Sequence, residues 1–392
     1  MMDDGEKARV KIGIVTFACD AGRSGIGQYV VQLLREFPNA APDVEFEVIG
    51  HEDELESLLP PEPHYTRRAV STAWKHPILN ILWQNWALPR LCTSRGYDAL
   101  FLPAANRRVP LWLPCPAVGT VHDFSSMHVK GKYDPMRDIY IKRLLPFLVR
   151  RLPRVIAVSE CTKRDIMHFA QCPPERIAVI PHGVDFDTYF PRDNAESEKK
   201  ISAKYGLRSP YILYVSRIEH PGKNHARLIH AFAQLKRDSD LPHQLVLAGS
   251  DWNRAEEVHR VAEATGLGED AIRFTGFVAN EDLPDLYCGA DLFVFPSLYE
   301  GFGMPILEAM ACGVPVACSN AASLPEVAGD GAAYFDPGDE KAIAETLRTT
   351  LTDASIRAHL IEKGRARVSG FSWTDATERT LNELLAASGK QP

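Results

Sequence analysis

Residues 11–37, KIGIVTFACDAGRSGIGQYVVQLLREF, decide the fold class of this chain. An apolar, β-rich run at Lys11–Phe17 breaks into a loop of small residues at Ala18–Gly27, and the helix-like stretch QYVVQLLREF follows. Strand, loop and helix in this order are the opening unit of a parallel α/β sheet.

The same alternation continues along the chain. Short apolar runs recur as FEVIG near 46, YDALFLP near 97, PAVGTVHD near 116, RVIAVSE near 154 and RIAVIPHG near 176. A second series starts after a charged, Pro-containing stretch and runs through YILYVSR, QLVLAGS, IRFTGF, LFVFPS, VPVACS and GAAYFD. Buried strands that alternate with helices predict parallel sheets covered on both faces. We therefore expect an α/β protein with two Rossmann-like, doubly wound domains that face a central cleft, the default ligand site.

The expected domain boundaries follow from this pattern. At 392 residues the chain exceeds the size of about 250 to 300 residues at which single cores stop growing. We assign residues 1–185 to an N-terminal domain, 186–209 to a linker that can include one helix, and 210–371 to a C-terminal domain. A last helix at 372–392 is expected to pack back on the first domain.

Composition excludes several classes of protein. A net charge of −7 argues against general nucleic-acid binding. The sequence has no run of about 18 apolar residues that could span a membrane, and its start is acidic and polar, unlike a signal peptide. The eight cysteines are scattered without a Cys-x-x-Cys pair, which favours free thiols in a reducing compartment. We expect a cytoplasmic protein.

The stretch FPSLYEGFGMPILEAMACGVP at Phe295–Pro315 carries the clearest functional pattern. A strand ends at its start, Gly301 and Gly303 let the backbone approach a ligand closely, and Pro305 suits the first turn of a helix. Free amides and the helix dipole favour an anion there, which predicts a phosphorylated ligand. Glu300 and Glu308 can face the same pocket and accept from pairs of sugar hydroxyls. In the alternative interpretation, Glu308 only satisfies the helix terminus and Glu300 is solvated.

Two basic residues follow the first strand of the second series, in YILYVSRIEHPGK. Arg217 lies just past the strand end, and Lys223 follows a turn made by Pro221 and Gly222. Two fixed cations aimed at one point can stabilise the charge on a departing diphosphate, a role that other enzymes give to a metal ion. A solvated basic loop is the alternative.

With these motifs, the chain resembles the retaining glycosyltransferases of GT-B fold, in their large fourth sequence family. The resemblance rests on Glu300 and Glu308 within EGFGMPILEAMACGVPV, on VSRIEHPGKN and on VIPHGVD at the domain junction, and it covers nearly the whole chain. It implies transfer of a hexose from a nucleotide sugar to an acceptor with retention of anomeric configuration. It also implies a donor site on the second domain, an acceptor site on the first, and no metal or other cofactor.

The resemblance also implies a role for each matching residue. Glu308 would hold the ribose hydroxyls, Glu300 the hydroxyls of the transferred sugar, and Arg217 and Lys223 the diphosphate. The backbone amides of the glycine loop would complete the donor site: Gly301, Phe302, Gly303 and Met304. Three more positions match those that approach the phosphates and the base: Gly249, Phe277 and Val278.

The first domain supplies three further candidates. Gly25 and Gly27 occupy the place of the family's glycine loop near the transferred group, with a plain tight turn as the alternative. They do not form a dinucleotide fingerprint, because Val30 stands where the third glycine should be. His122 ends the strand AVGTV, and a His there contacts the transferred sugar in the family; it could also help the acceptor to lose its proton. A structural histidine is the alternative.

Two other motifs have more than one interpretation. Asp185 and Asp187 resemble the metal-binding Asp-x-Asp of another glycosyltransferase fold, but they stand alone at the domain junction and are read as a turn. Residues 137–154, RDIYIKRLLPFLVRRLPR, mix apolar and basic side chains. Such stretches bind anionic lipid surfaces, which would suit a lipid-linked acceptor; a core helix with a solvated basic edge is the alternative.

These observations favour a metal-independent hexosyltransferase that acts on a glycan or lipid-linked saccharide in bacterial surface-polysaccharide biosynthesis. The general resemblance is to bacterial mannosyl- and rhamnosyltransferases, with GDP-mannose as the first candidate donor. The alternatives are a nucleotide-sugar epimerase or sugar-phosphate-utilising enzyme on the same scaffold, and a non-catalytic nucleotide-sugar-binding protein.

Overall fold

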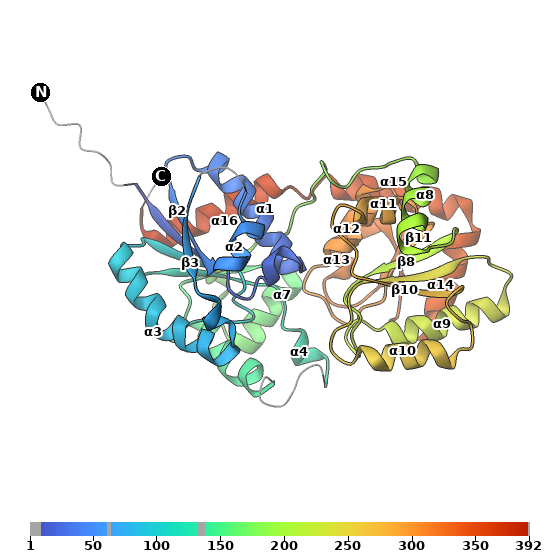
Figure 1. The fold of residues 1–392 in the computed structure, drawn as a ribbon, viewed down its shortest axis with the longest axis horizontal. Helices are drawn as coiled ribbons and strands as arrows, with labels where there is room; N and C mark the ends of the chain where they lie inside the picture. Colours follow the sequence, from blue (N-terminus) through green and yellow to red (C-terminus); the bar gives the residue numbers. More distant parts are fainter. Residues whose placement is uncertain (1–8, 61–63, 132–137, 391–392) are drawn as a thin grey trace, which may run out of the picture. The chain divides into compact units, whose positions relative to one another are not determined.

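The chain divides into two compact units, shown in Figure 1. The computed structural model describes residues 9–60, 64–131 and 138–390. The first unit comprises Met1–Phe124, Pro135–Gly183 and Trp373–Pro392, and the second comprises Ser125–Asp134 and Val184–Ser372. Each unit is built around its own parallel sheet, so the predicted α/β class with two Rossmann-like domains is confirmed.

The first unit contains a seven-stranded sheet in the order β3-β2-β1-β4-β5-β6-β7, in which all neighbouring strands are parallel. The apolar runs of the sequence form its central strands, and β4 and β5 are buried along their whole length. Its strands are β1 (Lys11–Val15), β2 (Glu45–His51), β3 (Tyr65–Val70), β4 (Ala99–Leu102), β5 (Ala117–Val121), β6 (Arg154–Ala157) and β7 (Ile177–Val179). Its helices are α1 (Gly25–Ala40), α2 (Glu52–Leu58), α3 (Pro77–Arg95), α6 (Leu145–Arg150), α7 (Glu160–Asp165) and α16 (Trp373–Ser388).

The second unit contains a six-stranded parallel sheet in the order β10-β9-β8-β11-β12-β13. Its strands are β8 (Tyr211–Val215), β9 (Gln244–Ala248), β10 (Ile272–Gly276), β11 (Leu292–Phe295), β12 (Val316–Ser319) and β13 (Ala332–Phe335). Its helices are α4 (Ser125–His128), α8 (Asn194–Tyr205), α9 (His225–Asp238), α10 (Ala255–Ala264), α11 (Leu283–Cys288), α12 (Met304–Ala311), α13 (Leu324–Ala328), α14 (Glu340–Thr352) and α15 (Ala354–Val368).

In both sheets the strand order reverses at one point. The reversal lies between β1 and β4 in the first unit and between β8 and β11 in the second. The loops that follow such a pair of strands turn to opposite sides of the sheet and leave a crevice at the carboxyl ends, where ligands of doubly wound proteins bind. This topology brings the loops after β8 and β11 together, although about 77 residues separate them, as the sequence separation of Lys223 and Glu300 shows.

The edge strand β3 did not emerge from the apolar pattern. Its sequence is YTRRAV, and only Tyr65 and Val70 at its two ends are buried. An edge strand needs few apolar side chains because one of its sides has no neighbouring strand, so the hydrophobic signal is weak.

The boundaries of the two units differ from the expected ones. Of the described residues, 125–131 belong to the second unit, although they lie within the sequence expected to form the first domain. The ring of His128 stacks on that of Tyr299 with centroids 4.2 Å apart, next to Glu300 in the chain.

The expected linker 186–209 also belongs to the second unit and contains the helix α8. Lys200 of α8 and Arg192 both pair with Asp285 of α11, the latter at 2.9 Å. These ion pairs tie the segment to α11. At the other end of the chain, α16 packs beside α1 in the first unit (Figure 1).

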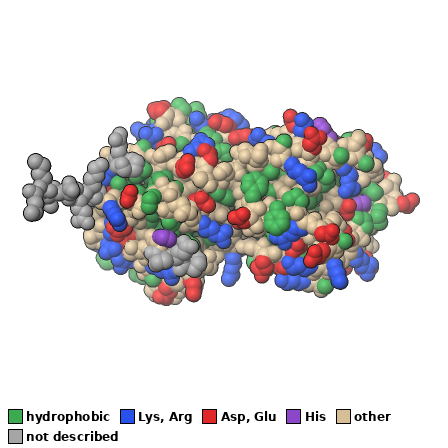
Figure 2. All heavy atoms as spheres, turned by 90° about the horizontal axis from the view of Figure 1, so that it is seen from above, with side chains coloured by type: hydrophobic (Ala, Val, Ile, Leu, Met, Phe, Trp, Pro, Cys, Tyr) green, Lys and Arg blue, Asp and Glu red, His purple; other side chains and the backbone are tan. Residues whose placement is uncertain are grey.

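The charged side chains on one face and the state of the cysteines bear on the expectations from composition. Basic and acidic side chains are interspersed on the face seen in Figure 2. All eight cysteines are free, and all but Cys115 are buried. Within the described ranges, none of the helices combines the length and the apolar character needed to cross a bilayer.

Candidate functional site

Lys223 and Glu300 meet at the strand-order reversal of the second unit. The Lys223 Nζ lies 2.6 Å from the Glu300 Oε1, and both side chains are largely buried. The two loops are also joined through their backbones, because Leu298 N donates to Gly222 O at 3.0 Å. Burial by itself would lower the pKa of Lys223, but the Glu300 carboxylate outweighs it and raises that pKa above its usual value. Lys223 is therefore a permanent cation.

Arg217 provides a second cation at the end of β8. Its guanidinium lies over the Trp252 ring, 4.8 Å from the centroid. Among the described residues no carboxylate lies within ion-pair distance of Arg217, which leaves its donors available to an anionic ligand.

Gly249 fixes the backbone that carries Arg217. It directly follows the neighbouring strand β9 with a φ of 150°, and a Cβ there would lie 1.9 Å from the carbonyl oxygen of Ser216. Only glycine permits this close approach of two backbones. Gly249 N also donates to Gly276 O at 3.0 Å, which joins the ends of β9 and β10.

The glycine loop ends at the N-terminus of α12. Gly303 precedes the helix with a φ of 109°, and a Cβ there would meet Leu324 Cδ2 at 2.9 Å. The Ser323 hydroxyl is 2.9 Å from Glu300 O and 3.0 Å from Phe302 O, and it holds the loop in place. Pro305 has no N–H, and Ile306 N donates to Gly303 O at 3.1 Å, so the N-terminus of α12 suits an anion through the Met304 N–H and the helix dipole.

Glu308 lies on α12 in a different environment from Glu300. Its Oε2 accepts a hydrogen bond from the Tyr287 hydroxyl at 2.7 Å. Burial raises the pKa of Glu308 to about 7, against the lowering effect of the Tyr287 hydrogen bond and with a smaller raising effect of Asp185. The carboxyl group is thus poised to change charge near neutral pH.

Two buried side chains that the sequence analysis did not single out lock the loops together. The Tyr214 hydroxyl donates to Lys223 O at 2.9 Å and lies 3.3 Å from the Ser297 Oγ. The Asn224 amide donates to Pro296 O at 3.0 Å and to Pro337 O at 2.8 Å. In the sequence, only their positions point to this role: Tyr214 lies just inside β8, and Asn224 directly follows Lys223.

Phe277 and Val278 follow β10 and differ in exposure. The Phe277 ring is exposed and the Val278 side chain is buried. They lie directly after Gly276, whose carbonyl accepts from Gly249, so this turn adjoins the backbone around Arg217.

In the first unit, Gly25 and Gly27 form the start of α1. Ser24 caps the helix by accepting from Gly27 N at 3.3 Å. A Cβ on Gly27 would lie 2.4 Å from Cys19 O, so glycine is required where α1 passes the loop after β1. Gly25 is exposed. The close approach of two backbones therefore explains the glycine at position 27.

His122 at the end of β5 is buried among other rings. Its Nε2 is 2.8 Å from Pro103 O, and its ring meets Tyr29 edge-on at 4.9 Å. A carbonyl accepts only, so Nε2 carries the proton. Burial lowers the pKa of His122 to about 4, with the Pro103 hydrogen bond opposing. The imidazole is neutral at physiological pH.

The junction motif behaves as a turn. The Asp185 carboxylate accepts from Thr188 N at 3.2 Å and from the Thr188 hydroxyl at 2.9 Å, as expected of an Asx-type turn. Across the described ranges, no three His, Cys, Asp or Glu side chains are grouped closely enough to hold a metal ion.

The structure thus brings most of the predicted site residues into one unit. The second unit holds two cations, two carboxylates and a helix N-terminus at the carboxyl ends of its strands, an arrangement suited to a phosphorylated, polyhydroxylated ligand. The residues concerned are Arg217, Lys223, Gly249, Phe277, Val278, Glu300, Gly301, Phe302, Gly303, Met304 and Glu308. The other three predicted residues, Gly25, Gly27 and His122, belong to the first unit.

Two family models match the chain. Residues 196–367 match the model of glycosyl transferases group 1, and residues 23–188 match that of glycosyltransferase family 4. The first match falls in the second unit, the second falls mainly in the first unit, and together they include all the predicted site residues.

Relatives and solved structures agree with these matches. The O-antigen chain mannosyltransferase B of Escherichia coli is 32% identical over 377 residues, covering 92% of this chain and 95% of the relative. The serotype-specific mannosyltransferase WbdA of Escherichia coli is 34% identical over 284 residues, which are 71% of this chain but only 34% of that longer protein. The crystal structure of Anabaena Alr3699/HepE in complex with UDP and glucose has a TM-score of 0.74 at 20% identity, covering 96% of this chain and 100% of the other. The chain therefore belongs to the group 1, family-four glycosyltransferases and has their GT-B fold.

Proposed function

We propose that this glycosyltransferase moves a hexose from a nucleotide sugar to a glycan or lipid-linked saccharide, with retention of anomeric configuration, in bacterial surface-polysaccharide biosynthesis. The observation that carries the proposal is the Lys223–Glu300 pair at the ends of β8 and β11, together with Arg217 after β8 and the N-terminus of α12 after β11. The cations suit the diphosphate, Glu300 suits the transferred sugar and Glu308 suits the ribose hydroxyls.

The reaction needs no metal in this proposal, because Arg217 and Lys223 supply the positive charge. The bond between the anomeric carbon and the diphosphate oxygen breaks, and the acceptor oxygen bonds to the same face of that carbon. The acceptor proton passes to the departing diphosphate. The cations stabilise the developing charge, and the remaining residues orient the reactants.

Mannose from GDP-mannose is the proposed donor. Its support is the names of the relatives, which are mannosyltransferases and include a protein of O-antigen chain synthesis. A mannan or mannose-containing chain of the cell surface is the corresponding acceptor class.

We also propose a cytoplasmic location with peripheral contact to the inner face of the membrane through residues 137–154, of which Arg137 lies outside the described residues. In the described part Leu144 and Phe147 are exposed, whereas Leu145 and Leu148 are buried. The segment thus combines a core side with an exposed apolar and basic side, and the exposed side suits a lipid-linked acceptor.

A thermal-shift panel with GDP-, UDP-, dTDP- and ADP-sugars tests the proposal, because a ligand that binds only the folded state raises the midpoint. We expect a shift with GDP-mannose that is lost in Glu308→Ala. Incubation with a mannose-containing acceptor should then give a product whose NMR coupling constants show the donor's anomeric configuration. An inverted product would refute retention. Conversion of the donor without an acceptor would favour the epimerase alternative, and binding without any turnover would favour a non-catalytic protein.

A further inference from the structure

The first half of α3 is oriented with its apolar side outward and its polar side inward. Asn80 and Gln84 are 2% and 4% exposed, whereas Ile78, Leu82 and Trp86 are 63%, 56% and 62% exposed. A surface helix of a globular protein has the reverse pattern. In Figure 1, α3 runs along the outer margin of the first unit. An exposed apolar face of this size indicates an interaction surface.

The inward polar side chains are satisfied, so the orientation of α3 is stable. Gln84 Nε2 donates to Asn80 Oδ1 at 2.6 Å, and Arg108 donates to the same oxygen. The Asn80 amide lies 3.4 Å from the His51 Nε2. These hydrogen bonds of buried polar side chains favour one arrangement, and rotating α3 to hide its apolar side would break them.

The apolar surface continues beyond α3. Leu111 N donates to Asn85 Oδ1 at 2.7 Å, and an Arg151 N–H donates to Leu111 O at 2.9 Å. Leu111 therefore links α3 to the end of α6. We define the outer face of the first unit by its exposed apolar residues, which are Ile78, Leu79, Ile81, Leu82, Trp86, Leu111, Trp112 and Phe147.

The segments that form this outer face carry only positive charge. No Asp or Glu occurs at 72–97, 99–122 or 139–159, in a chain whose net charge is −7. The same three segments contain ten basic residues: Lys75, Arg90, Arg95, Arg107, Arg108, Lys142, Arg143, Arg150, Arg151 and Arg154. Carboxylates from other segments pair with five of these ten: Lys75, Arg95, Arg107, Lys142 and Arg154. Among the described residues no carboxylate pairs with Arg90, Arg150 or Arg151, which donate to Trp86 O, Gln171 Oε1 and Leu111 O and keep an uncompensated positive charge.

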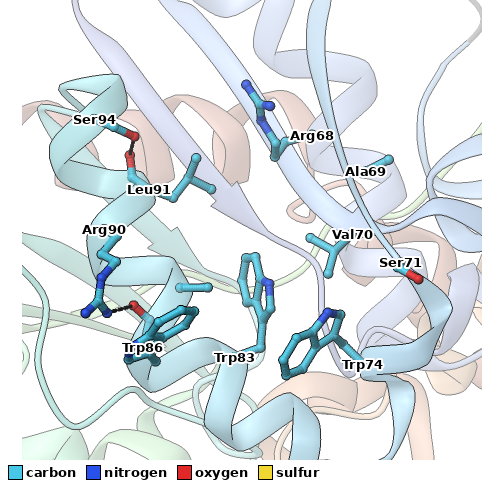
Figure 3. Close-up of a pocket in the computed structure, with 11 residues that line it drawn as sticks. Arg68, Ala69, Val70, Ser71, Trp74, Trp83, Trp86, Arg90, Leu91 and Ser94 are labelled. Atoms are coloured by element: carbon cyan, nitrogen blue, oxygen red, sulfur yellow. Dashed lines mark hydrogen bonds between the residues drawn. The ribbon is translucent and has the colours of Figure 1, made fainter.

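An open groove between β3 and α3 shows what kind of ligand this surface suits. It has a volume of about 510 Å³, and Figure 3 shows Trp86, Trp83 and Trp74 along it with Arg90 beside Trp86. The Arg90 guanidinium lies 4.3 Å from the Trp86 ring centroid. None of the residues that line the groove is Asp, Glu, Asn or Gln, the side chains that bind sugar hydroxyls most readily. Tryptophan and arginine beside aliphatic side chains are typical of a membrane interface.

We propose that the outer face lies in the headgroup region of an anionic bilayer, with the apolar side of α3 inserted and Trp86 and Trp112 at the interface. Burial of the aliphatic side chains drives insertion, and the basic residues attract anionic lipid. This inference deepens the proposed membrane contact by naming α3 as the inserted element, and it rests on that part of the proposed function. It is independent of the transfer reaction.

Flotation of the full chain with vesicles, without donor or acceptor, tests the proposal. Vesicles of phosphatidylcholine alone are compared with vesicles containing about one third phosphatidylglycerol, and we expect binding to the latter that weakens with salt. Leu82→Ser should lower the partition coefficient about tenfold, the loss expected for one buried aliphatic side chain, and Leu82→Glu should lower it further. The matched control is Ala358→Glu, which adds the same charge at an exposed helical position of the second unit. Brominated lipid should quench wild-type fluorescence more than that of Trp86→Phe.

The outcomes of these experiments distinguish insertion of α3 from the proposed membrane contact through residues 137–154. Unchanged binding of Leu82→Glu, together with loss of binding in the double variant Arg150→Gln/Arg151→Gln, would overturn insertion of α3 and leave the contact through 137–154. No binding of the wild type to either vesicle would overturn both membrane proposals. A concentration-dependent dimer that Leu82→Glu dissociates, or a glycan that protects Trp86 from quenching, would assign the face to another partner. Because Leu82 is exposed, a normal thermal midpoint of its variants confirms that they fold.

Discussion

The Lys223 Nζ and the Glu300 Oε1 lie 2.6 Å apart at the carboxyl ends of β8 and β11. The pair holds a cation in the crevice and orients a carboxylate at the same time. Its charge is permanent because the pKa of Lys223 is raised by Glu300 despite burial. Both side chains can therefore act on one ligand, the lysine on its phosphate and the glutamate on its hydroxyls.

Lys223→Met should reduce kcat by about two to three orders of magnitude, the effect of removing one donor that stabilises transition-state charge. Arg217→Ala should have a comparable effect. The double variant Lys223→Met/Glu300→Gln should lose less activity than the sum of its single changes, because the two residues act as one unit. Steady-state kinetics measure all three variants. Lys341→Met is the control, since Lys341 is exposed on α14. Near-normal turnover of both cation variants would contradict the proposed mechanism.

Gly249→Ala should destabilise the protein more than Gly268→Ala and should also reduce turnover. Both glycines have positive φ, but a Cβ on Gly249 meets Ser216 O at 1.9 Å, whereas nothing lies within 4 Å of one on Gly268. Gly268→Ala should cost about 1 to 2 kcal/mol from the left-handed conformation alone. Urea denaturation and kcat of the two variants give the comparison. Equal destabilisation by the two substitutions would show that the backbone at Ser216 moves aside at little cost in free energy.

The stability of the ligand-free protein should fall as pH rises through the range from about 4.5 to 7, through the contribution of Glu308. Burial raises the pKa of Glu308 in the folded state to about 7, from a usual value near 4.5. The folded state binds more protons than the unfolded state in this range, so raising the pH favours unfolding. Glu308→Gln should remove this component while leaving the Tyr287 hydroxyl with an acceptor. Thermal midpoints of the wild type and of Glu308→Gln from pH 4.5 to 8 measure this contribution. Identical pH profiles of the two proteins would exclude it.

The affinity for the donor should also depend on the ionisation of Glu308, and it should rise with pH where the stability of the ligand-free protein falls. A carboxylate that accepts from two ribose hydroxyls must be ionised, so affinity should rise as pH increases through about 7 in the wild type. Isothermal titration in buffers of different ionisation enthalpy should detect proton release on binding at pH 6. Absence of proton release would indicate that Glu308 does not face the ligand as a carboxylate.

His122 should stay neutral from pH 5 to 8. Burial lowers its folded-state pKa to about 4, below the usual 6.5. The unfolded state therefore binds more protons, and the stability contributed by His122 is lost as pH falls from about 6.5 to 4. Histidine ring NMR signals should show no titration of His122 near 6.5, and His122→Asn should reduce the acid sensitivity of the thermal midpoint. A titration near 6.5 would mean that the ring reaches solvent.

The sequence by itself determined the fold class and predicted the residues of the candidate site. Short apolar runs separated by helical stretches report parallel strands because each run must be buried between helix layers. The phrase around Glu300, Gly303 and Glu308 is local, so its glycine loop and helix start could be read from spacing alone. The edge strand β3 was not predicted because the residues between Tyr65 and Val70 are mostly polar and exposed.

Only the tertiary structure decided which distant residues meet. Lys223 and Glu300 come together because β8 and β11 are neighbours, although β9 and β10 lie between them in the chain. Only the structure also shows that Trp252 packs under Arg217 and that residues 125–131 belong to the second unit. The sequence of α3 is apolar on most of its circumference, and the buried contacts of Asn80 and Gln84 turned its apolar side to solvent. Local periodicity encodes which segments are strands and helices, whereas strand order and the partners of buried polar groups depend on the whole chain.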